Sequence, residues 1–376
     1  MIDNALPDDP TPKPLSSVPL DAWHRALGAR MVAFAGYAMP VQYQGVLAEH
    51  LHCRAQAALF DVSHMGQATL SGAAAAGALE RLVPGDILGL KPGRQRYTLL
   101  TNEAGGILDD LMVANLGGDA LFLVVNASRK DVDFTHIAAN LPPGVQLRPN
   151  EDRALLALQG PAAAAAIGRL APEAAGLRFM DVAAVTLAGA ACLVSRSGYP
   201  GEDGFEISVP ADDARVVAQR ILDQPEVAPA GLGARDSLRL EAGLCLYGND
   251  IDELTSPIEA DLAWTIGRRR RAAWDFPGGA AIRDQLQHGV TRRRVGIRPD
   301  GRAPARALTE VVAGDGTEAG TVTSGGFSPT LSAPIAMGYV RKDLAGDGTA
   351  LHLMVRGKPL PARVVPMPFV PHRYAS

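Results

Sequence analysis

Apolar and polar residues follow two different periods along this chain, and the period changes irregularly. Residues 19–31 place Trp23, Leu27 and Met31 at helical spacing, which predicts a short helix. Further on, apolar runs of strand length lie between glycine-rich turns. The predicted strands of this region cover residues 57–72, 95–106, 107–116 and 120–128, and the predicted helices cover residues 73–83 and 130–141. This irregular mixture predicts an α+β fold rather than a doubly wound sheet.

The pattern changes again near residue 289. Beyond that point, short strands alternate with Gly, Pro and Asp turns at roughly 8–12-residue spacing, which predicts a small C-terminal β-barrel. The chain has 376 residues, more than a single core usually holds, so we expect a multi-domain protein. The expected divisions are a flexible leader at residues 1–17, two interleaved α+β subdomains at residues 18–288 and the barrel at residues 289–376.

The composition is that of an ordinary globular protein, with 47% hydrophobic and 20% charged residues. A net charge of −4 provides no overall attraction to nucleic acid. No apolar run reaches about 18 residues, so we expect no membrane span. The first residues are rich in Pro, Asp and Ser and carry neither a signal-peptide pattern nor an Arg-rich transit pattern, which led us to expect a cytoplasmic protein.

The cysteines do not indicate a disulfide framework or a zinc site. Their number is odd, they lie far apart, and neither CxxC nor HExxH occurs. We therefore expect three buried, reduced thiols and no metal. These cysteines are Cys53, Cys192 and Cys245. His64 has no nucleophile beside it that would form a catalytic pair, and we expect a packed core histidine there.

Two adjacent carboxylates interrupt the apolar strand at residues 107–116. Neighbouring side chains of a strand point to opposite faces, so Asp109 and Asp110 cannot form a proton-sharing dyad. One should face a cleft, and the other should bind turn amides or face solvent. Alternation alone does not decide which residue has which role.

A third carboxylate also lies in an apolar setting. Glu206 follows Phe205 in a predicted strand, and a buried carboxylate there needs a partner or a ligand. An ion pair and a ligand contact fit this segment equally well. The glycines before it predict a hairpin, because the lysine of a phosphate loop is missing. On the helix predicted at residues 231–244, Arg235 and Arg239 are four residues apart, which is typical of an exposed face.

Two arginine runs occur late in the chain, at Arg268–Arg271 and Arg292–Arg294. Such runs usually form solvated faces. The alternative is a docking surface for an acidic partner, because complementary charge speeds encounter.

Nine motifs, in order from about residue 18 to the C-terminus, resemble the glycine cleavage T-protein family. They are MVAFAGYAMPVQY, LFDVSHMGQ, YTLLTNEAGGILDDLMV, LALQGP, GYPGEDGFEISV, ARDSLRLEAGLCLYGNDID, WTIGRRRRA, TVTSGGFSPTL and IAMGYV. The resemblance implies three domains around a folate cleft, with residues 18–288 forming the folate-binding catalytic region. It also implies an aminomethyltransferase that releases ammonia from the aminomethyl-lipoyl arm of H-protein and passes the methylene to tetrahydrofolate.

The same resemblance implies roles for individual residues. Asp110, the second aspartate of the pair, corresponds to the essential carboxylate. Glu206 and Arg235 correspond to the pterin contacts, and a carboxylate and a guanidinium suit the donor and acceptor edges of that ring. The residues implied to form the aromatic part of the folate site are Tyr97, Tyr199 and Tyr374. The H-protein is generally acidic, which makes Arg268, Arg269, Arg270 and Arg271, or Arg292–Arg294, candidates for docking it.

Two other functions share parts of this pattern. The folate-binding half of a sarcosine or dimethylglycine demethylating enzyme would need a flavin, and this chain has no strand–GxGxxG–helix unit. A non-catalytic folate-binding factor for iron–sulfur assembly carries a diagnostic cysteine motif near the barrel, and the segment VTSGGFSP has none.

Overall fold

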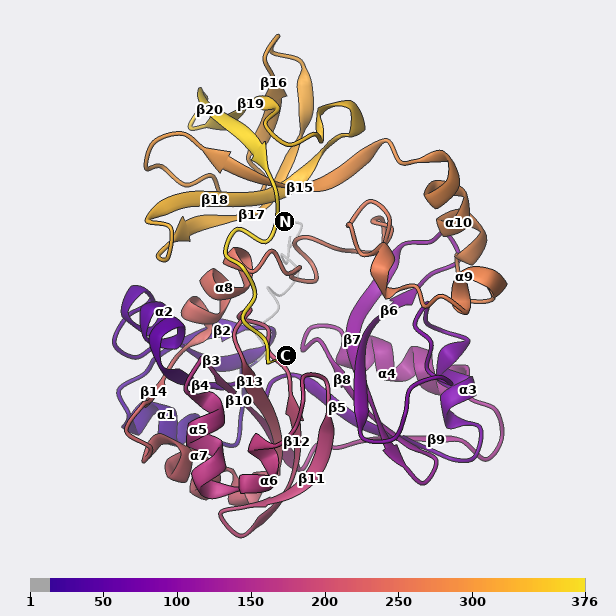
Figure 1. Ribbon diagram of the computed structural model, residues 1–376, viewed down its shortest axis with the longest axis vertical. Helices are drawn as coiled ribbons and strands as arrows, with labels where there is room; N and C mark the ends of the chain where they lie inside the picture. The colour runs from indigo at the N-terminus through magenta and orange to yellow at the C-terminus, as the bar shows by residue number, and fades with distance from the viewer. Residues whose placement is uncertain (1–13, 376) are drawn as a thin grey trace, which may run out of the picture.

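The computed structural model describes residues 14–375 and has three parts, two built on β-sheets and one a closed barrel (Figure 1). The expected α+β class and the C-terminal barrel are confirmed. Within residues 14–375, no helix is both long and apolar enough to cross a membrane.

The first part is a five-stranded sheet with helices on one face. Its strands, in spatial order, are β6 (Arg94–Thr101), β7 (Ile107–Gly117), β8 (Ala120–Val125), β5 (Gly66–Ser71) and β9 (Gln146–Pro149). The helices α3 (Ala75–Glu80) and α4 (Lys130–Ala139) belong to this part. Leu111 and Val113 of β7 pack with Leu79 of α3 and Ile137 of α4 in its core.

The second part is a six-stranded sheet that takes one strand from before the first part and five from after it. Its strands, in spatial order, are β11 (Val182–Leu187), β12 (Ala190–Arg196), β13 (Gly204–Pro210), β10 (Arg153–Gln159), β4 (Ala57–Asp61) and β14 (Val227–Pro229). The helices around it are α1 (Asp21–Ala26), α2 (Val46–Ala55), α5 (Ala163–Leu170), α6 (Pro172–Ala175), α7 (Ala214–Leu222) and α8 (Leu232–Glu241), with the 3-10 turn η1 (Ala211–Asp213) before α7. The two parts are therefore interleaved along the chain.

The segment before α2 differs from the predicted helix at residues 19–31. The helix α1 ends at Ala26, Gly28 adopts a φ of +78°, and Met31 lies in a strand. A three-stranded sheet forms here from β1 (Ser16–Ser17), β3 (Tyr37–Gln42) and β2 (Arg30–Phe34). Of the predicted leader, residues 1–13 lie outside the described part, and Ser16–Ser17 pairs with β3 instead of being free.

The third part is the barrel, in the order β15 (Arg292–Pro299), β18 (Ala333–Arg341), β17 (Glu318–Ser328), β16 (Glu310–Ala313), β19 (Ala350–Val355) and β20 (Lys358–Val365). The 3-10 turn η3 (Lys342–Leu344) follows β18. The connection to the barrel contains η2 (Ala263–Thr265), α9 (Arg270–Ala273) and α10 (Gly279–His288). Figure 1 shows the barrel above the two sheet-based parts, with α8 beneath it.

The helix α8 joins these parts, and the expectation that its arginines form an exposed face is wrong. Arg239 is only 2% exposed and pairs with Asp250 at 2.7 Å. It also donates a 2.9 Å hydrogen bond to Ser324 of β17. The helix lies between the second part and the barrel, so Arg239 meets the Asp250 carboxylate and a hydroxyl of the barrel.

The two sheets pack against each other through the faces that their helices do not cover. Ala114 of β7 and Phe122 of β8 pack against Val182 of β11, with Leu193 of β12 beside them. Gly106 permits the turn before β7 to lie against the loop at residues 252–255, because a Cβ there would lie 1.8 Å from the Glu253 carbonyl oxygen. The start of β7, which carries both aspartates, is held in place by that loop.

The fold predicts a large difference between two leucine truncations. Leu156 is fully buried in the core of the six-stranded sheet, whereas Leu47 of α2 is 56% exposed. Leu156→Ala should lower the free energy of unfolding by about 2–5 kcal/mol, because it removes buried surface and leaves a cavity. Leu47→Ala should change it by less than about 0.5 kcal/mol. Urea unfolding followed by circular dichroism measures both, and equal losses would contradict this packing.

Candidate active site

Strand alternation directs Asp110 into the space between the two sheets. Met112 and Ala114, two and four residues further along β7, line a narrow cavity there, and Glu206 of β13 lines it from the opposite sheet. Leu111 and Val113 point the other way, into the helix-covered core. Asp110 therefore shares a face with the cavity-lining residues, and Asp109 faces the helices.

Two donors hold the Asp110 carboxylate. The Tyr97 hydroxyl donates to Oδ2 at 2.9 Å, and the Asn126 side-chain amide donates to Oδ1 at 2.7 Å. Tyr97 is opposite Met112 in the β6–β7 ladder, which places its side chain on the same face as Asp110. Burial, together with the neighbouring Asp109, raises the pKa of Asp110 to about 7. This carboxyl group therefore changes its charge near neutral pH.

Asp109 is fully buried and has a different environment. The Asn126 main-chain amide donates to it at 3.0 Å and the Asn126 side chain at 2.9 Å. Burial, with Asp133 of α4 nearby, raises the pKa of Asp109 to about 9, so Asp109 carries its proton at neutral pH. Asp109 is thus the aspartate that binds a main-chain amide after the strand, and it is not exposed to solvent.

Asn126 was not identified from the sequence, although it contacts both aspartates. It directly follows β8, the neighbour of β7 in the sheet. A polar residue directly after an apolar strand was the only available signal, and such residues are common in turns.

Glu206 and Arg235 approach the same space from two elements. Ser197 donates a 2.9 Å hydrogen bond to Glu206 Oε2. The Arg235 guanidinium lies over the Tyr199 ring, 4.8 Å from its centroid. Its Nη1 is buried and finds no hydrogen-bond partner within residues 14–375. Burial lowers the pKa of Arg235 and the charge of Glu206 opposes that shift, so the arginine is a desolvated cation with unused donors.

Aromatic side chains border this space. The Tyr199 hydroxyl donates to the Cys245 carbonyl at 2.6 Å, which fixes the ring. Tyr374 stacks on Phe179 with centroids 4.5 Å apart. Tyr97 stacks on Trp264, which is 63% exposed. Trp264 was also missed in the sequence, where it stands in a loop just before an arginine run.

The predicted residues therefore converge. The charge of Asp110 contributes to raising the pKa values of Tyr97 and Tyr199, after burial, which is the main cause. Burial raises the pKa of Tyr374 to about 12, and the charge of Glu206 makes a smaller contribution in the same direction. The carboxylates, the arginine and the tyrosines occupy one region between the sheets and beneath α8.

Most arginines of the first run bind groups within the protein, unlike the free arginines of a docking surface. Arg270 is 1% exposed, donates to the Glu80 carbonyl at 2.8 Å and pairs with Asp275, so it is not available to a partner. Arg269 pairs with Glu80 and Asp86. Within the described chain, Arg268 is exposed and makes no ion pair or side-chain hydrogen bond. The run is largely a structural connection between α9 and the first part.

The second run is also engaged within the molecule. Arg292 pairs with Glu259 at 2.9 Å, and Arg293 pairs with Asp261 at 2.6 Å. Arg294 is 6% exposed and donates to the carbonyls of Ala260 and Gly243. Arg294 therefore cannot belong to a docking surface.

The remaining candidates lie in the core. The three cysteines are buried and free, as expected. His64 is 3% exposed, its ring meets Phe34 edge-on, and burial lowers its pKa to about 4. In the described part of the chain, no group of three His, Cys, Asp or Glu residues has the arrangement of a metal site.

Several known proteins resemble this chain over nearly its whole length. Mitochondrial aminomethyltransferases of Gallus gallus and Homo sapiens are 50% and 48% identical, covering 96% of this chain and 94% and 91% of their own. The crystal structure of glycine cleavage system aminomethyltransferase T from Bartonella henselae superposes with a TM-score of 0.91 at 42% identity. It covers 96% of this chain and 100% of its own.

The names of these relatives correct one expectation. Relatives from animals and from the plant Flaveria trinervia are named mitochondrial, which contradicts the cytoplasmic location expected from the sequence. That expectation depended only on the absence of a recognisable targeting pattern, and an absent pattern is weak evidence for a compartment.

Two family models account for most of the chain. The GCVT N-terminal domain matches residues 20–270, and the glycine cleavage T-protein C-terminal barrel domain matches residues 292–371. The first match spans both sheets and the candidate site residues except Tyr374, and the second spans the six-stranded barrel. The chain belongs to the glycine cleavage T-protein family of aminomethyltransferases.

Proposed function

We propose that Asp110 is the catalytic residue of this aminomethyltransferase. The reaction releases ammonia from aminomethyl-lipoyl H-protein and transfers the methylene to tetrahydrofolate, giving 5,10-methylenetetrahydrofolate and dihydrolipoyl H-protein. The single observation that supports the assignment is the position of Asp110, a carboxyl group with a pKa of about 7 on the strand face whose Met112 and Ala114 line the cavity that Glu206 borders.

The residues around this space fit a folate. The pterin ring presents two adjacent N–H donors, which a carboxylate such as Glu206 can accept together. Its carbonyl and ring nitrogens are acceptors, and Arg235 has a buried Nη1 without a partner. Tyr97, Tyr199 and Tyr374 provide aromatic surface for the rings. Tetrahydrofolate, when bound, supplies the nucleophilic amine.

Asp110 can act on charge that develops during transfer. The carbon that leaves the sulfur of the lipoyl arm becomes electron-poor, and an adjacent carboxylate stabilises that positive character. A carboxyl group with a pKa near neutrality can also accept a proton from an attacking amine. Tyr97 and Asn126 keep both oxygens in place for either role. Asp110 and Glu206 are partly exposed, so the bound substrates would have to cover the site, because water would otherwise capture the electrophile.

The alternatives are not favoured. Relatives at 44–50% identity, aligned over almost the whole chain, carry the name aminomethyltransferase. The site also keeps the acidic residue that a non-catalytic folate binder would not need.

Asp110→Asn should lower kcat by roughly 10²–10⁴-fold, because the amide keeps the shape but loses the negative charge and the basic oxygen. The measurement is formation of 5,10-methylenetetrahydrofolate from aminomethylated H-protein. Asp109→Asn is the matched control and should reduce kcat less than about tenfold, because Asp109 is already neutral at pH 7. Full activity of the Asp110 variant, or equal losses in both, would refute the assignment.

The rate should depend on pH through Asp110. Its pKa in the free enzyme is about 7, so the ionised fraction falls as pH drops below 7 and approaches one above it. We therefore expect kcat/KM for tetrahydrofolate to rise with pH through about 7 and to level off roughly one pH unit higher. Asp110→Asn should lose this limb. A wild-type profile that is flat between about pH 5.5 and 8.5 would argue against the ionised carboxylate as the active form.

We propose that Arg268 helps to dock the acidic H-protein, since it is the arginine of its run that is exposed and unengaged within residues 14–375. Arg268→Glu should raise KM for H-protein and weaken its dependence on salt, with kcat retained. Arg302→Glu, which reverses an exposed arginine of the barrel part, is the control and should change neither. Identical KM values in both variants would exclude this surface.

A further inference from the structure

The C-terminal segment leaves the barrel and runs past α8 to the six-stranded sheet part (Figure 1). After β20 ends at Val365, three contacts fix this segment. The Val370 amide donates to the Glu241 carbonyl at 3.0 Å, and His372 Nε2 binds the Ala242 carbonyl at 2.8 Å. The Arg373 amide donates to the Gly201 carbonyl at 2.8 Å. The segment therefore lies along the end of α8 and the loop before β13.

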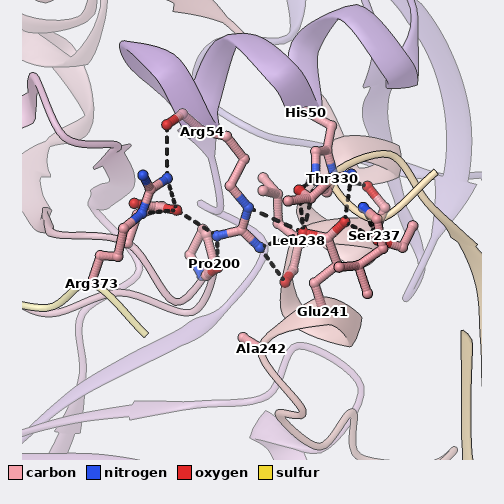
Figure 2. Close-up of polar contacts among 12 residues, drawn as sticks. His50, Arg54, Pro200, Ser237, Leu238, Glu241, Ala242, Thr330 and Arg373 are labelled. Atoms are coloured by element: carbon pink, nitrogen blue, oxygen red, sulfur yellow. Dashed lines mark hydrogen bonds and ion pairs between the residues drawn. The ribbon is translucent and has the colours of Figure 1, made fainter. Parts of the chain in front are cut away.

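Arg54 of α2 forms the centre of a buried ion-pair cluster beside this segment. Its guanidinium contacts Glu241 Oε2 at 2.8 Å and Glu202 Oε1 at 2.6 Å, and it donates to the Pro200 carbonyl at 2.9 Å. Both glutamate side chains are fully buried. Figure 2 shows Arg54 reaching from its helix between Pro200, Leu238 and Glu241.

Glu241 extends this cluster to the barrel. Its carboxylate accepts hydrogen bonds from the Ser328 and Thr330 hydroxyls at 2.5 and 2.7 Å, and it lies 3.1 Å from His50 (Figure 2). These contacts, with burial opposing them, lower the pKa of Glu241 to about 2. The carboxylate stays ionised, and α8, α2 and the barrel are held against one another.

Arg373 adds the C-terminal segment to the same cluster. Its guanidinium binds Glu202 Oε1 at 2.5 Å, the oxygen that Arg54 also contacts, and donates to the Arg54 carbonyl at 2.8 Å. The two arginines thus balance the charges of Glu202 and Glu241. Arg373 is half exposed, whereas the other three side chains are buried. Arg373 is therefore the member that can be replaced without opening a cavity, and its loss leaves Arg54 as the remaining cation on Glu202.

The residue that follows Arg373 is Tyr374. Its ring stacks on Phe179 with centroids 4.5 Å apart and meets the His372 ring at a tilt of 46°, 5.0 Å away. The ring also lies close enough to Glu206 for that charge to affect its pKa. The described contacts of Tyr374 do not include a side-chain hydrogen bond, so its location depends on stacking and on its neighbours in the chain.

We infer that Arg54, Glu202 and Arg373 form a clamp that holds Tyr374 against the folate site, which makes Arg373 a positioning residue for folate binding. This inference rests on the proposed function. Arg373 acts through Tyr374 and not through contact with the folate.

Arg373→Met tests the clamp, because methionine keeps much of the aliphatic stem and removes the charge. Tetrahydrofolate should bind roughly three- to tenfold more weakly, the range expected when an aromatic contact is lost. The KM for tetrahydrofolate should rise with kcat at saturation unchanged, and the KM for H-protein should not move. Arg373→Lys should recover part of the affinity. Arg363→Met, which breaks the exposed 3.1 Å pair with Asp300 on the barrel, is the control and should bind as wild type does.

A double-mutant cycle separates positioning from general destabilisation. If Arg373 acts through Tyr374, Arg373→Met should have no further effect on tetrahydrofolate affinity in a Tyr374→Ala background. Calorimetric titration gives the affinities, and thermal unfolding shows that each variant is folded. Equal losses from Arg373→Met with and without Tyr374, or wild-type affinity in the single variant, would overturn the clamp.

The same experiments distinguish the clamp from the proposed function. Wild-type affinity in Tyr374→Ala would overturn the clamp and leave the activity of the protein intact. Failure of the wild-type chain to bind tetrahydrofolate would overturn the proposed function itself.

Discussion

The burial of charged side chains between two facing β-sheets is the constraint on which the site depends. A carboxyl group in such a place must be protonated, hydrogen-bonded or paired. Between the sheets, Asp110 receives two donors and Glu206 accepts from Ser197. Asp109, on the helix-covered face of the same strand, keeps its proton. Arg235 has a buried Nη1 that finds no partner within residues 14–375. The same packing therefore produces a carboxyl group that titrates near neutrality and a cation available to a ligand.

The helix α8 connects this site to the rest of the molecule. Arg235 points toward Tyr199, Arg239 reaches Asp250 and the barrel, and Glu241 binds Arg54 and Thr330. Because these three residues belong to one helix, the position of the barrel and the position of Arg235 are linked. A protein assembled from three parts thereby keeps one defined cleft, and its C-terminal segment can return to that cleft from the barrel.

Buried arginines supply much of this connection. Arg54, Arg270 and Arg294 each bind main-chain carbonyl oxygens of distant segments, and Arg54 and Arg270 also bind carboxylates. A guanidinium has five N–H donors in a fixed plane, so it can satisfy several acceptors at once. Removing one such partner leaves groups that cannot easily be rehydrated. Charged residues here serve mainly as internal connections, and Arg268 is an exception within its run.

The sequence by itself determined the mixed fold class, the barrel and the opposite orientation of Asp109 and Asp110. These properties follow from local periodicity: a strand alternates its faces wherever it lies, and repeated short strands with turn residues close into a barrel. The motif pattern selected Asp110, Glu206, Arg235 and three tyrosines, and the structure places all six around one region.

Only the tertiary structure decided which polar groups are buried and what they meet. Arg270 and Arg268 look alike in the sequence, but Glu80 and Asp275 bury the first, while the second remains exposed. Asn126 reaches both aspartates because β8 is adjacent to β7. Asp109 keeps its proton because the surrounding elements bury it and, secondly, because α4 brings Asp133 near it. The position of a residue in the hydrophobic pattern shows which face of its strand or helix it occupies. Its charge state and its partners depend on which distant segments cover that face, and no local pattern contains that information.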